Sequence, residues 1–191
     1  GMKVVYNMPP VPFYTGYVCH ALRDRAGLRF FPSPEEADRM PFDDKTRAGF
    51  KMAMQHGVDI VASQTSVLLK LGDSFSQSAG STSLKRIISR PAMLARAARA
   101  RVRAALHRRS ILPRDLWSVK ALICYGMDTA AFKADLRRAW GAEPFEVYGS
   151  TETGGIAFQT WDRKGLVFSP YYCFLEFVPE ADADFGPQII D

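Results

Sequence analysis

The sequence predicts an α/β fold in which a mostly parallel sheet is flanked by helices and followed by a short antiparallel β region. Short apolar segments alternate with segments of helical spacing as far as residue 148. Such alternation is typical of parallel strands joined by helices. After residue 155, three short apolar segments follow one another without a helix between them. The 191 residues, 47% apolar and 24% charged, have an ordinary globular composition and suffice for a sizeable core.

Each expected strand is a short apolar segment that ends at a turn or at polar residues. In the parallel part these segments are Lys3–Asn7, Leu28–Phe31, Val58–Ala62, Lys120–Tyr125 and Phe145–Tyr148. In the antiparallel part they are Ile156–Thr160, Gly165–Ser169 and Phe174–Pro179. We expect residues 2–155 to form the α/β portion of one domain, residues 156–180 its β-rich continuation, and residues 181–191 a tail.

Helices are expected between the strands wherever apolar residues recur at helical spacing. Three of the expected helices are Phe13–Ala26, Pro91 to about Arg109, and Asp128–Trp140. A fourth spans residues 42–56, with Asp43 or Asp44 as its N-cap. A fifth is capped by Thr65 or Ser63 and runs to Leu71. Gly27, Gly57 and Gly141 are suited to end three of them. The polar segment from Ser74 to Ser83 is expected to be a loop.

The inward faces of three helices can be predicted from their apolar residues. The first helix is expected to bury one set of side chains: Tyr14, Tyr17, Val18, Ala21 and Leu22. The helix that begins at Pro91 is expected to bury a second set: Leu94, Ala98, Val102, Ala105 and Leu106. The last helix is expected to bury a third set: Ala131, Phe132, Leu136 and Trp140. The aromatic group Phe13, Tyr14 and Tyr17 fits the core better than a ligand platform.

The net charge of +5 belongs to one segment, residues 85–114. No acidic residue lies between Gly80 and Arg114, whereas ten basic residues do, so the rest of the chain sums to +5 − 10 = −5. Such a segment is either a solvated helix face or a contact for an acidic partner. Because no aromatic residue lies among these arginines, we do not expect nucleic-acid binding. The basic residues are Lys85, Arg86, Arg90, Arg96, Arg99, Arg101, Arg103, Arg108, Arg109 and Arg114.

Cysteine and histidine residues give no sign of a metal site or of a disulfide framework. Cys19 and Cys124 lie among apolar neighbours and are expected to be core thiols in a reducing compartment, and Cys173 completes an odd count. His20, His56 and His107 lie on different expected helices. No apolar segment is long enough to span a membrane and no leader precedes the first strand, so we expect a cytoplasmic protein.

Polar residues at the end of the last parallel strand form the candidate site. Ligands of parallel α/β sheets bind beyond the carboxyl ends of the strands. Residues 149–151, Gly-Ser-Thr, offer backbone N–H groups and hydroxyls to a phosphate there. Glu152 could hold Mg²⁺, and the ring of Tyr148 could lie on a flat base. An ordinary turn has the same composition, so the residues alone leave both interpretations open.

The segment Tyr148–Gly155 resembles the Tyr-Gly-x-Thr-Glu motif of the adenylate-forming superfamily, which includes acyl-CoA synthetases, phenylacetate–CoA ligases and firefly luciferase. Leu122–Asp128 resembles the strand-and-glycine segment that those enzymes place against adenine. Leu116-Trp117 and Phe174–Pro179 resemble the acyl-acid amido synthetases related to the plant auxin-conjugating enzymes. The resemblance covers residues 112–180 and, more weakly, residues 3–71.

The resemblance implies ATP and AMP as ligands, Mg²⁺ as the metal and a small carboxylic acid as the substrate. Thr151 would bind the α-phosphate and Glu152 would bind Mg²⁺, which makes these two the expected catalytic residues. Residues 7–14 and 63–66 would lie near the acyl substrate. The nucleotide would contact Gly126, Met127, Asp128, Tyr148, Gly149, Ser150 and Thr151. The implied reaction forms an acyl adenylate and pyrophosphate, and then transfers the acyl group to an amine or a thiol.

Other parts of the family pattern have no counterpart here. The family's Ser/Thr/Gly-rich phosphate loop precedes the region covered, and the similar composition of Ser78–Lys85 lies at the wrong place in the order. No Tyr-Arg-x-Gly-Asp-like segment and no C-terminal lid with its lysine follow. We therefore expect a partial ligase domain with little activity alone, completed by other ligase portions or by a homodimer. The alternative is a non-catalytic domain of the same fold that contacts acidic partners through the Arg-rich helix.

Overall fold

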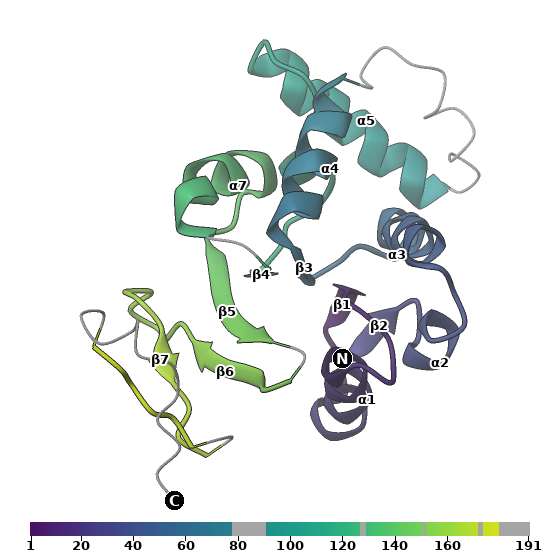
Figure 1. Cartoon of the computed structure of the whole chain (residues 1–191). Coiled ribbons are helices and arrows are strands. Elements are labelled where there is room, and N and C mark those ends of the chain that lie inside the picture. Colours follow the sequence, from purple (N-terminus) through teal and green to yellow (C-terminus); the bar gives the residue numbers. More distant parts are fainter. Residues whose placement is uncertain (78–90, 127–128, 151, 172–173, 180–191) are drawn as a thin grey trace, which may run out of the picture.

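The computed structural model describes residues 1–77, 91–126, 129–150, 152–171 and 174–179, and shows a seven-stranded sheet. The strand order is β2-β1-β3-β4-β5-β6-β7 (Figure 1). Strands β1 to β5 pair in parallel, and β5, β6 and β7 pair antiparallel. The predicted fold class is therefore confirmed. The strands are β1 (Lys3–Asn7), β2 (Arg29–Phe31), β3 (Ile60–Gln64), β4 (Ala121–Tyr125), β5 (Pro144–Ser150), β6 (Gly154–Phe158) and β7 (Val167–Phe168).

Helices cover both faces of the parallel strands, but unequally. In Figure 1, α3, α4, α5 and α7 lie above the strands, and α1 lies below β1 and β2. The upper face buries the larger core, which includes Val5, Phe31, Val61 and Leu122. The helices are α1 (Tyr14–Ala26), α2 (Pro34–Ala37), α3 (Phe42–His56), α4 (Thr65–Gln77), α5 (Pro91–Leu106), α6 (Pro113–Leu116) and α7 (Lys133–Trp140), with a 3₁₀ turn, η3 (Thr129–Phe132), before α7.

Three aromatic side chains form the centre of the larger core. The rings of Trp117 and Trp140 stack with an interplanar angle of 12° and centroids 6.1 Å apart. Phe50 packs against both, at 5.8 Å and 6.1 Å. Each indole N–H is satisfied, because Trp117 donates to the carbonyl of Ala53 at 3.1 Å and Trp140 to that of Leu68 at 3.2 Å. This cluster joins α3, α4, α6 and α7 over the sheet.

The N-terminus of α3 is not capped as predicted, whereas Gly57 ends the helix as predicted. Its N-cap is Pro41, which makes no side-chain cap, and Asp43 and Asp44 lie inside the first turn, where their charge favours the helix dipole. At the other end the Nζ of Lys3 donates to the carbonyl of His56 at 2.7 Å, and the guanidinium of Arg96 donates to that of Met54. Two cations from distant parts of the chain therefore cap the C-terminal carbonyls of α3.

Several element boundaries differ from the prediction. Strand β3 begins two residues later than expected and includes Ser63 and Gln64, and α4 continues to Gln77 where a loop was expected. The rest of the expected loop, residues 78–83, lies outside the described residues. The helix expected at Asp128–Trp140 is a 3₁₀ turn followed by α7, and β7 has only two residues. The described residues 174–179 form no strand, so that prediction is wrong.

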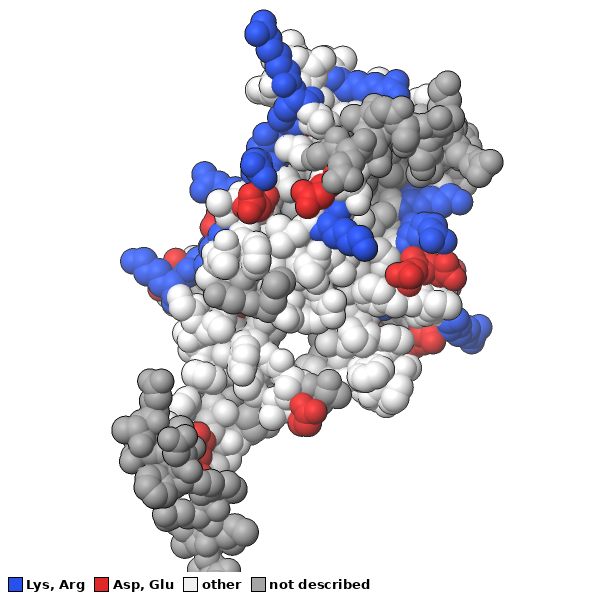
Figure 2. Space-filling view, turned by 45° about the horizontal axis from the view of Figure 1, so that its top comes forward, with Lys and Arg blue, Asp and Glu red and all other residues white. Residues whose placement is uncertain are grey.

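Two of the three predicted inward faces, those of α1 and α5, are also wrong, whereas the third is confirmed at Leu136 and Trp140. Helix α1 buries Gly16 and Cys19 and exposes Tyr17, Ala21 and Leu22. Phe13 is also exposed, so the expected aromatic core group does not form, and Ala131 is exposed too. Helix α5 buries small residues and exposes all five residues that were expected inside. In Figure 2, Lys and Arg side chains gather over the upper part of the view, where α5 lies. The buried residues of α5 are Met93, Ala97, Ala100 and Ala104.

Candidate functional site

The carboxyl ends of β1 and β3 carry buried polar side chains. Asn7 lies opposite Ser63 in the register of the two strands, and its amide donates to the Ser63 hydroxyl at 3.2 Å. The hydroxyl of Thr46, on α3, donates to the amide oxygen of Asn7 at 2.6 Å. Because Asn7 and Ser63 are almost fully buried and each has a partner, they fix the edge of the sheet rather than leave polar atoms unsatisfied.

A second group of polar atoms follows at β4. The hydroxyl of Thr65 at the start of α4 lies 2.8 Å from that of Thr129 and donates to the carbonyl of Tyr125 at 3.4 Å. The phenol of Tyr125 donates back to the carbonyl of Asn7 at 3.4 Å. These contacts join the ends of β1, β3 and β4 into one polar edge. Gly126 ends β4 with a φ of 92°, a conformation that favours glycine.

The motif Tyr148–Gly155 forms the end of β5, a turn and the start of β6. Gly126 comes two residues after Cys124, and Tyr148 comes two residues after Glu146, which is the partner of Cys124 in the sheet. Gly126 and Tyr148 therefore leave the parallel strands at the same level. Tyr148 is 56% exposed, and Gly149, Ser150 and Glu152 are exposed as well.

Hydrogen bonds within the turn order its hydroxyl groups. The Oγ of Ser150 accepts from the backbone N–H of Thr153 at 3.2 Å and lies 2.9 Å from the Thr153 hydroxyl. A hydrogen bond from Ser150 lowers the pKa of the Glu152 carboxyl, which is therefore ionised at neutral pH. The turn thus presents a carboxylate beside two hydroxyls. Thr151, Met127 and Asp128, which were predicted to bind nucleotide, lie outside the described residues.

Close packing holds the turn against helix α1. A methyl group added to Gly154 would lie 2.9 Å from the ring of Tyr14, and one added to Gly149 would lie 2.1 Å from the carbonyl oxygen of Gly154. Gly154 also has a φ of 71°. Both glycines are therefore required by the geometry of the turn, and Tyr14 links the turn to the loop that follows β1.

We expect Gly149→Ala to open the β5–β6 turn, because the new methyl group would meet the backbone of Gly154 and Gly155. The expected cost is about 1–3 kcal/mol of unfolding free energy. Gly155→Ala is the matched control, since its methyl group would meet only the Phe158 ring, at 2.8 Å, and that ring can move. Amide hydrogen exchange should show faster exchange in residues 147–158 for Gly149→Ala than for Gly155→Ala. Equal protection in the two variants would contradict the packing described.

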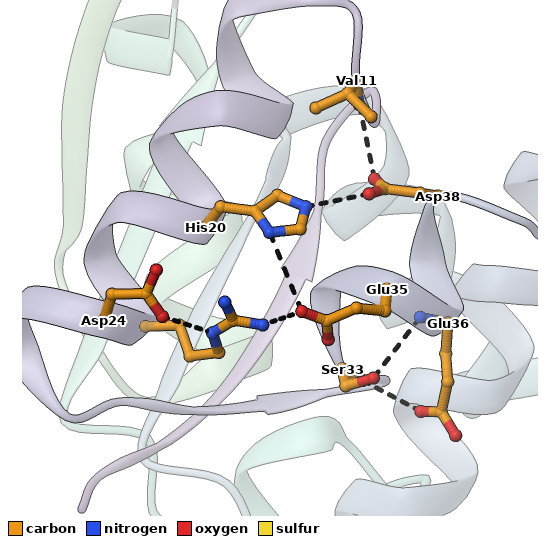
Figure 3. Close-up of polar contacts among 8 residues, drawn as sticks. Val11, His20, Asp24, Ser33, Glu35, Glu36 and Asp38 are labelled. Carbon is orange, nitrogen blue, oxygen red and sulfur yellow. Dashed lines mark hydrogen bonds and ion pairs between the residues drawn. The ribbon is translucent and has the colours of Figure 1, made fainter.

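The loop between β1 and α1, residues 8–13, is held by polar contacts (Figure 3). Asp38 accepts from the backbone N–H of Val11 at 3.4 Å, and its other oxygen lies 2.8 Å from the Nε2 of His20. The opposite ring nitrogen of His20 lies 3.9 Å from Glu35. Buried Lys45 donates to the carbonyl of Met8, and burial lowers the pKa of its ammonium group. The contacts with Asp38 and Glu35 therefore hold the His20 ring in place between α1 and α2.

A cavity lies at the other end of the sheet. It has a volume of about 530 Å³, and its walls include Lys3, Asp59, Arg96 and Ser118, at the amino ends of β1, β3 and β4. Lys3 and Arg96 already donate hydrogen bonds to carbonyl groups of α3 there. Because ligands of parallel sheets bind at the carboxyl ends, we assign the candidate site to that end of the strands, with the exposed β5–β6 turn, and not to this cavity.

Cys19 and Cys124 are free cysteines and both are buried. Burial raises the pKa of the Cys19 and Cys124 thiols to about 12, so both are protonated core thiols, as predicted. Cys173 lies outside the described residues. Within the described parts of the chain, no group of three His, Cys, Asp or Glu side chains could hold a metal ion. No helix in those parts is long and apolar enough to cross a membrane.

The sequence did not single out four polar residues at the carboxyl ends of β1, β3 and β4: Thr46, Lys45, Tyr125 and Thr129. Residues 7–14 and 63–66 were expected near an acyl substrate, and the structure brings Asn7 and Ser63 together at the edge. The signal that could have found Thr129 is its position just after a strand end and a glycine. Thr46 and Lys45 give no such signal, since they lie within a helix whose approach to β1 depends on tertiary packing.

Comparison of the sequence with models of known protein families and with curated proteins found no match.

Proposed function

We propose that this chain provides the adenylate-binding edge of an adenylate-forming ligase of the acyl-acid amido synthetase type. One observation carries the proposal: Tyr148, Gly149, Ser150 and Glu152 are exposed together at the carboxyl end of β5, the last parallel strand, and in the turn after it. That is the place where ligands of parallel α/β sheets bind. The sequence resemblance of this turn and of residues 122–128 to the superfamily gives the ligand its identity, ATP or AMP.

The proposed roles follow the chemistry of the side chains. The ring of Tyr148 lies against adenine, the backbone N–H groups and hydroxyls of residues 149–151 bind the α-phosphate, and Gly126 leaves room beside the base. Glu152, ionised and exposed, suits Mg²⁺ because that ion combines one or two carboxylates with phosphate oxygens and water. When bound, Mg²⁺ supplies positive charge to the phosphoryl oxygens.

The proposed reaction begins with attack of a substrate carboxylate oxygen on the α-phosphorus of ATP, which forms an acyl adenylate and releases pyrophosphate. An amine or a thiol then displaces AMP. The protein contributes by positioning and by electrostatic stabilisation, without a covalent protein intermediate. We propose that this chain binds nucleotide but has little adenylating activity alone. Robust pyrophosphate exchange by the isolated chain with carboxylic acids would contradict the second part.

Calorimetric titration tests the nucleotide site. We expect AMP to bind without metal, and Thr151→Ala to weaken that binding about tenfold or more, because a hydrogen bond to a charged phosphate is lost. Glu152→Gln should leave AMP binding in EDTA unchanged and weaken the binding of ATP with Mg²⁺. The difference between these two results distinguishes a metal ligand from a residue that only shapes the turn, because a residue of the second kind would affect the binding of both nucleotides.

Glu143→Gln is the matched control, since Glu143 immediately precedes β5 and so lies at the opposite end of the same strand. It should bind both nucleotides like the unaltered protein. If neither nucleotide binds, or if Thr151→Ala and Glu152→Gln both bind as tightly as the control, the site assignment is wrong.

A further inference from the structure

Helix α5 has two apolar faces, of which only one packs against the protein. The packed face consists of Met93 and three alanines. The opposite face is exposed and carries larger side chains, with Leu94 and Val102 more than half exposed and Leu106 still more so. Four of its members are spaced four residues apart and form one continuous row along the helix. The residues of this face, called here the α5 outer face, are Leu94, Ala98, Val102, Ala105 and Leu106.

Arginines flank the α5 outer face on both sides. At 100° per residue, Arg101 lies on one side of the row, and Arg99 and Arg103 lie on the other. Within the described residues these three arginines form no ion pair, whereas Arg96 caps α3 and Arg109 pairs with Asp115. The helix contains no acidic residue. An apolar row between two lines of unpaired positive charge is the complement of an acidic amphipathic helix.

The shape of the row favours a helix over other occupants. Large and small side chains alternate at Leu94, Ala98 and Val102, which leaves a depression at Ala98 for a side chain of a second helix. The row has no aromatic residue of the kind that anchors helices in membrane interfaces. A second copy of α5 would bring arginines against arginines. Nucleic acid would use the arginines but not the apolar row between them.

We propose that the α5 outer face binds an amphipathic helix of a protein partner, with leucine-like residues on the row and Asp or Glu side chains toward Arg99, Arg101 and Arg103. This surface lies on the helical layer above the sheet, away from the β5–β6 turn (Figure 1). A partner bound to α5 therefore needs no contact with that turn.

The experiment uses a fluorescein-labelled synthetic peptide of 18 residues, with leucines on one helical face and glutamates on both sides of that face. Fluorescence anisotropy with the full chain should show saturable binding. Val102→Asp should weaken it about tenfold, as should Arg101→Glu combined with Arg103→Glu. Val178→Asp is the matched control, because both valines are 59% exposed and Val178 lies far from α5 in the sequence. Arg25→Glu, at an exposed residue in the last turn of α1, is the control for charge.

A peptide of the same composition with its leucines scattered around the helix should bind at least about tenfold more weakly. Equal binding of the two peptides, or no effect of Val102→Asp, would overturn the proposal in favour of charge attraction alone. The proposal also fails if the peptide does not bind while anionic vesicles, duplex DNA or a second copy of the chain does so in a Val102-dependent way. Circular dichroism of each variant ensures that a loss of binding is not a loss of fold.

Discussion

Replacing Trp140 by alanine should lower the free energy of unfolding by about 3–5 kcal/mol, as is usual for a large aromatic side chain removed from a core. Trp140 is almost fully buried at the centre of four helices, stacks on Trp117 and packs against Phe50. Its removal leaves a cavity that these rings cannot close without losing their own contacts. The carbonyl of Leu68 also loses its indole donor.

Trp161→Ala is the matched control, since this tryptophan is 94% exposed and should change stability by no more than about 0.5 kcal/mol. Urea denaturation followed by far-UV circular dichroism measures both variants. A cost below about 1 kcal/mol for Trp140→Ala would mean that the core is not packed as described.

Asp115→Asn should destabilise the protein by about 3 kcal/mol, because it breaks a buried ion pair from one side. The carboxylate of Asp115 is almost fully buried and accepts two hydrogen bonds from Arg109, at 2.6 Å and 2.8 Å, and one from the backbone N–H of Leu112 at 2.9 Å. The guanidinium of Arg109 would be left without its countercharge. These bonds hold the connection between α5 and β4.

The stability that Asp115→Asn removes should depend on pH. Burial alone would raise the pKa of the Asp115 carboxyl, but the hydrogen bonds from Arg109 and Leu112 outweigh it and lower that pKa. The ion pair therefore contributes fully above the unfolded pKa of about 3.9, and its contribution is lost as the pH falls through the lower folded pKa. The stability difference between Asp115→Asn and the unaltered protein should be constant from about pH 5 to 8 and shrink below about pH 4.

Asp44→Asn is the control for this experiment. Asp44 pairs with Arg47 at 3.1 Å and its charge favours the dipole of α3, but both side chains are more than half exposed, so the expected effect is no more than about 1 kcal/mol. If Asp115→Asn costs no more than this control at neutral pH, the pair does not stabilise the fold.

The parallel strands could be predicted from the sequence because each is a short apolar segment between turn residues. Strand β1 was predicted with its observed bounds, and β4 to within one residue. The short helix α2 was missed, although Ser33 and Glu36 form a capping box that is visible in the sequence. The expected strand at Phe174–Pro179 was wrong because apolar composition alone does not supply a pairing partner.

The buried faces of α1 and α5 could not be predicted, and the physical reason is the same in both. Hydrophobicity favours the larger side chains as the inward face, but these helices approach their neighbours closely and bury small residues. A methyl group on Gly16 would lie 2.1 Å from the backbone nitrogen of Val11, and α5 packs through Ala97, Ala100 and Ala104. How closely a helix approaches its neighbours depends on the tertiary structure, and the spacing of apolar residues along the sequence does not reveal it.

The candidate site could be predicted in part. The segment Tyr148–Gly155 contains the end of the last parallel strand and the turn after it, and the sequence indicated this place because a strand end marked by glycine and hydroxyl residues is a local pattern. The bonds of Asn7 with Ser63 and of Thr65 with Thr129 were not predictable, since the residues in each pair are 56 and 64 positions apart. Such partners are set by the strand order, which a single sequence does not give.

The strand order has a consequence for synthesis of the chain on the ribosome. Strand β2 pairs on one side of β1, and every later strand is added at the other, growing edge: β3 beside β1, then β4, β5, β6 and β7. None of these seven strands must be inserted between two that are already paired. A nascent chain that has emerged as far as Gln64 already contains the three strands β2, β1 and β3, and translation can extend the sheet one strand at a time in the direction in which it proceeds.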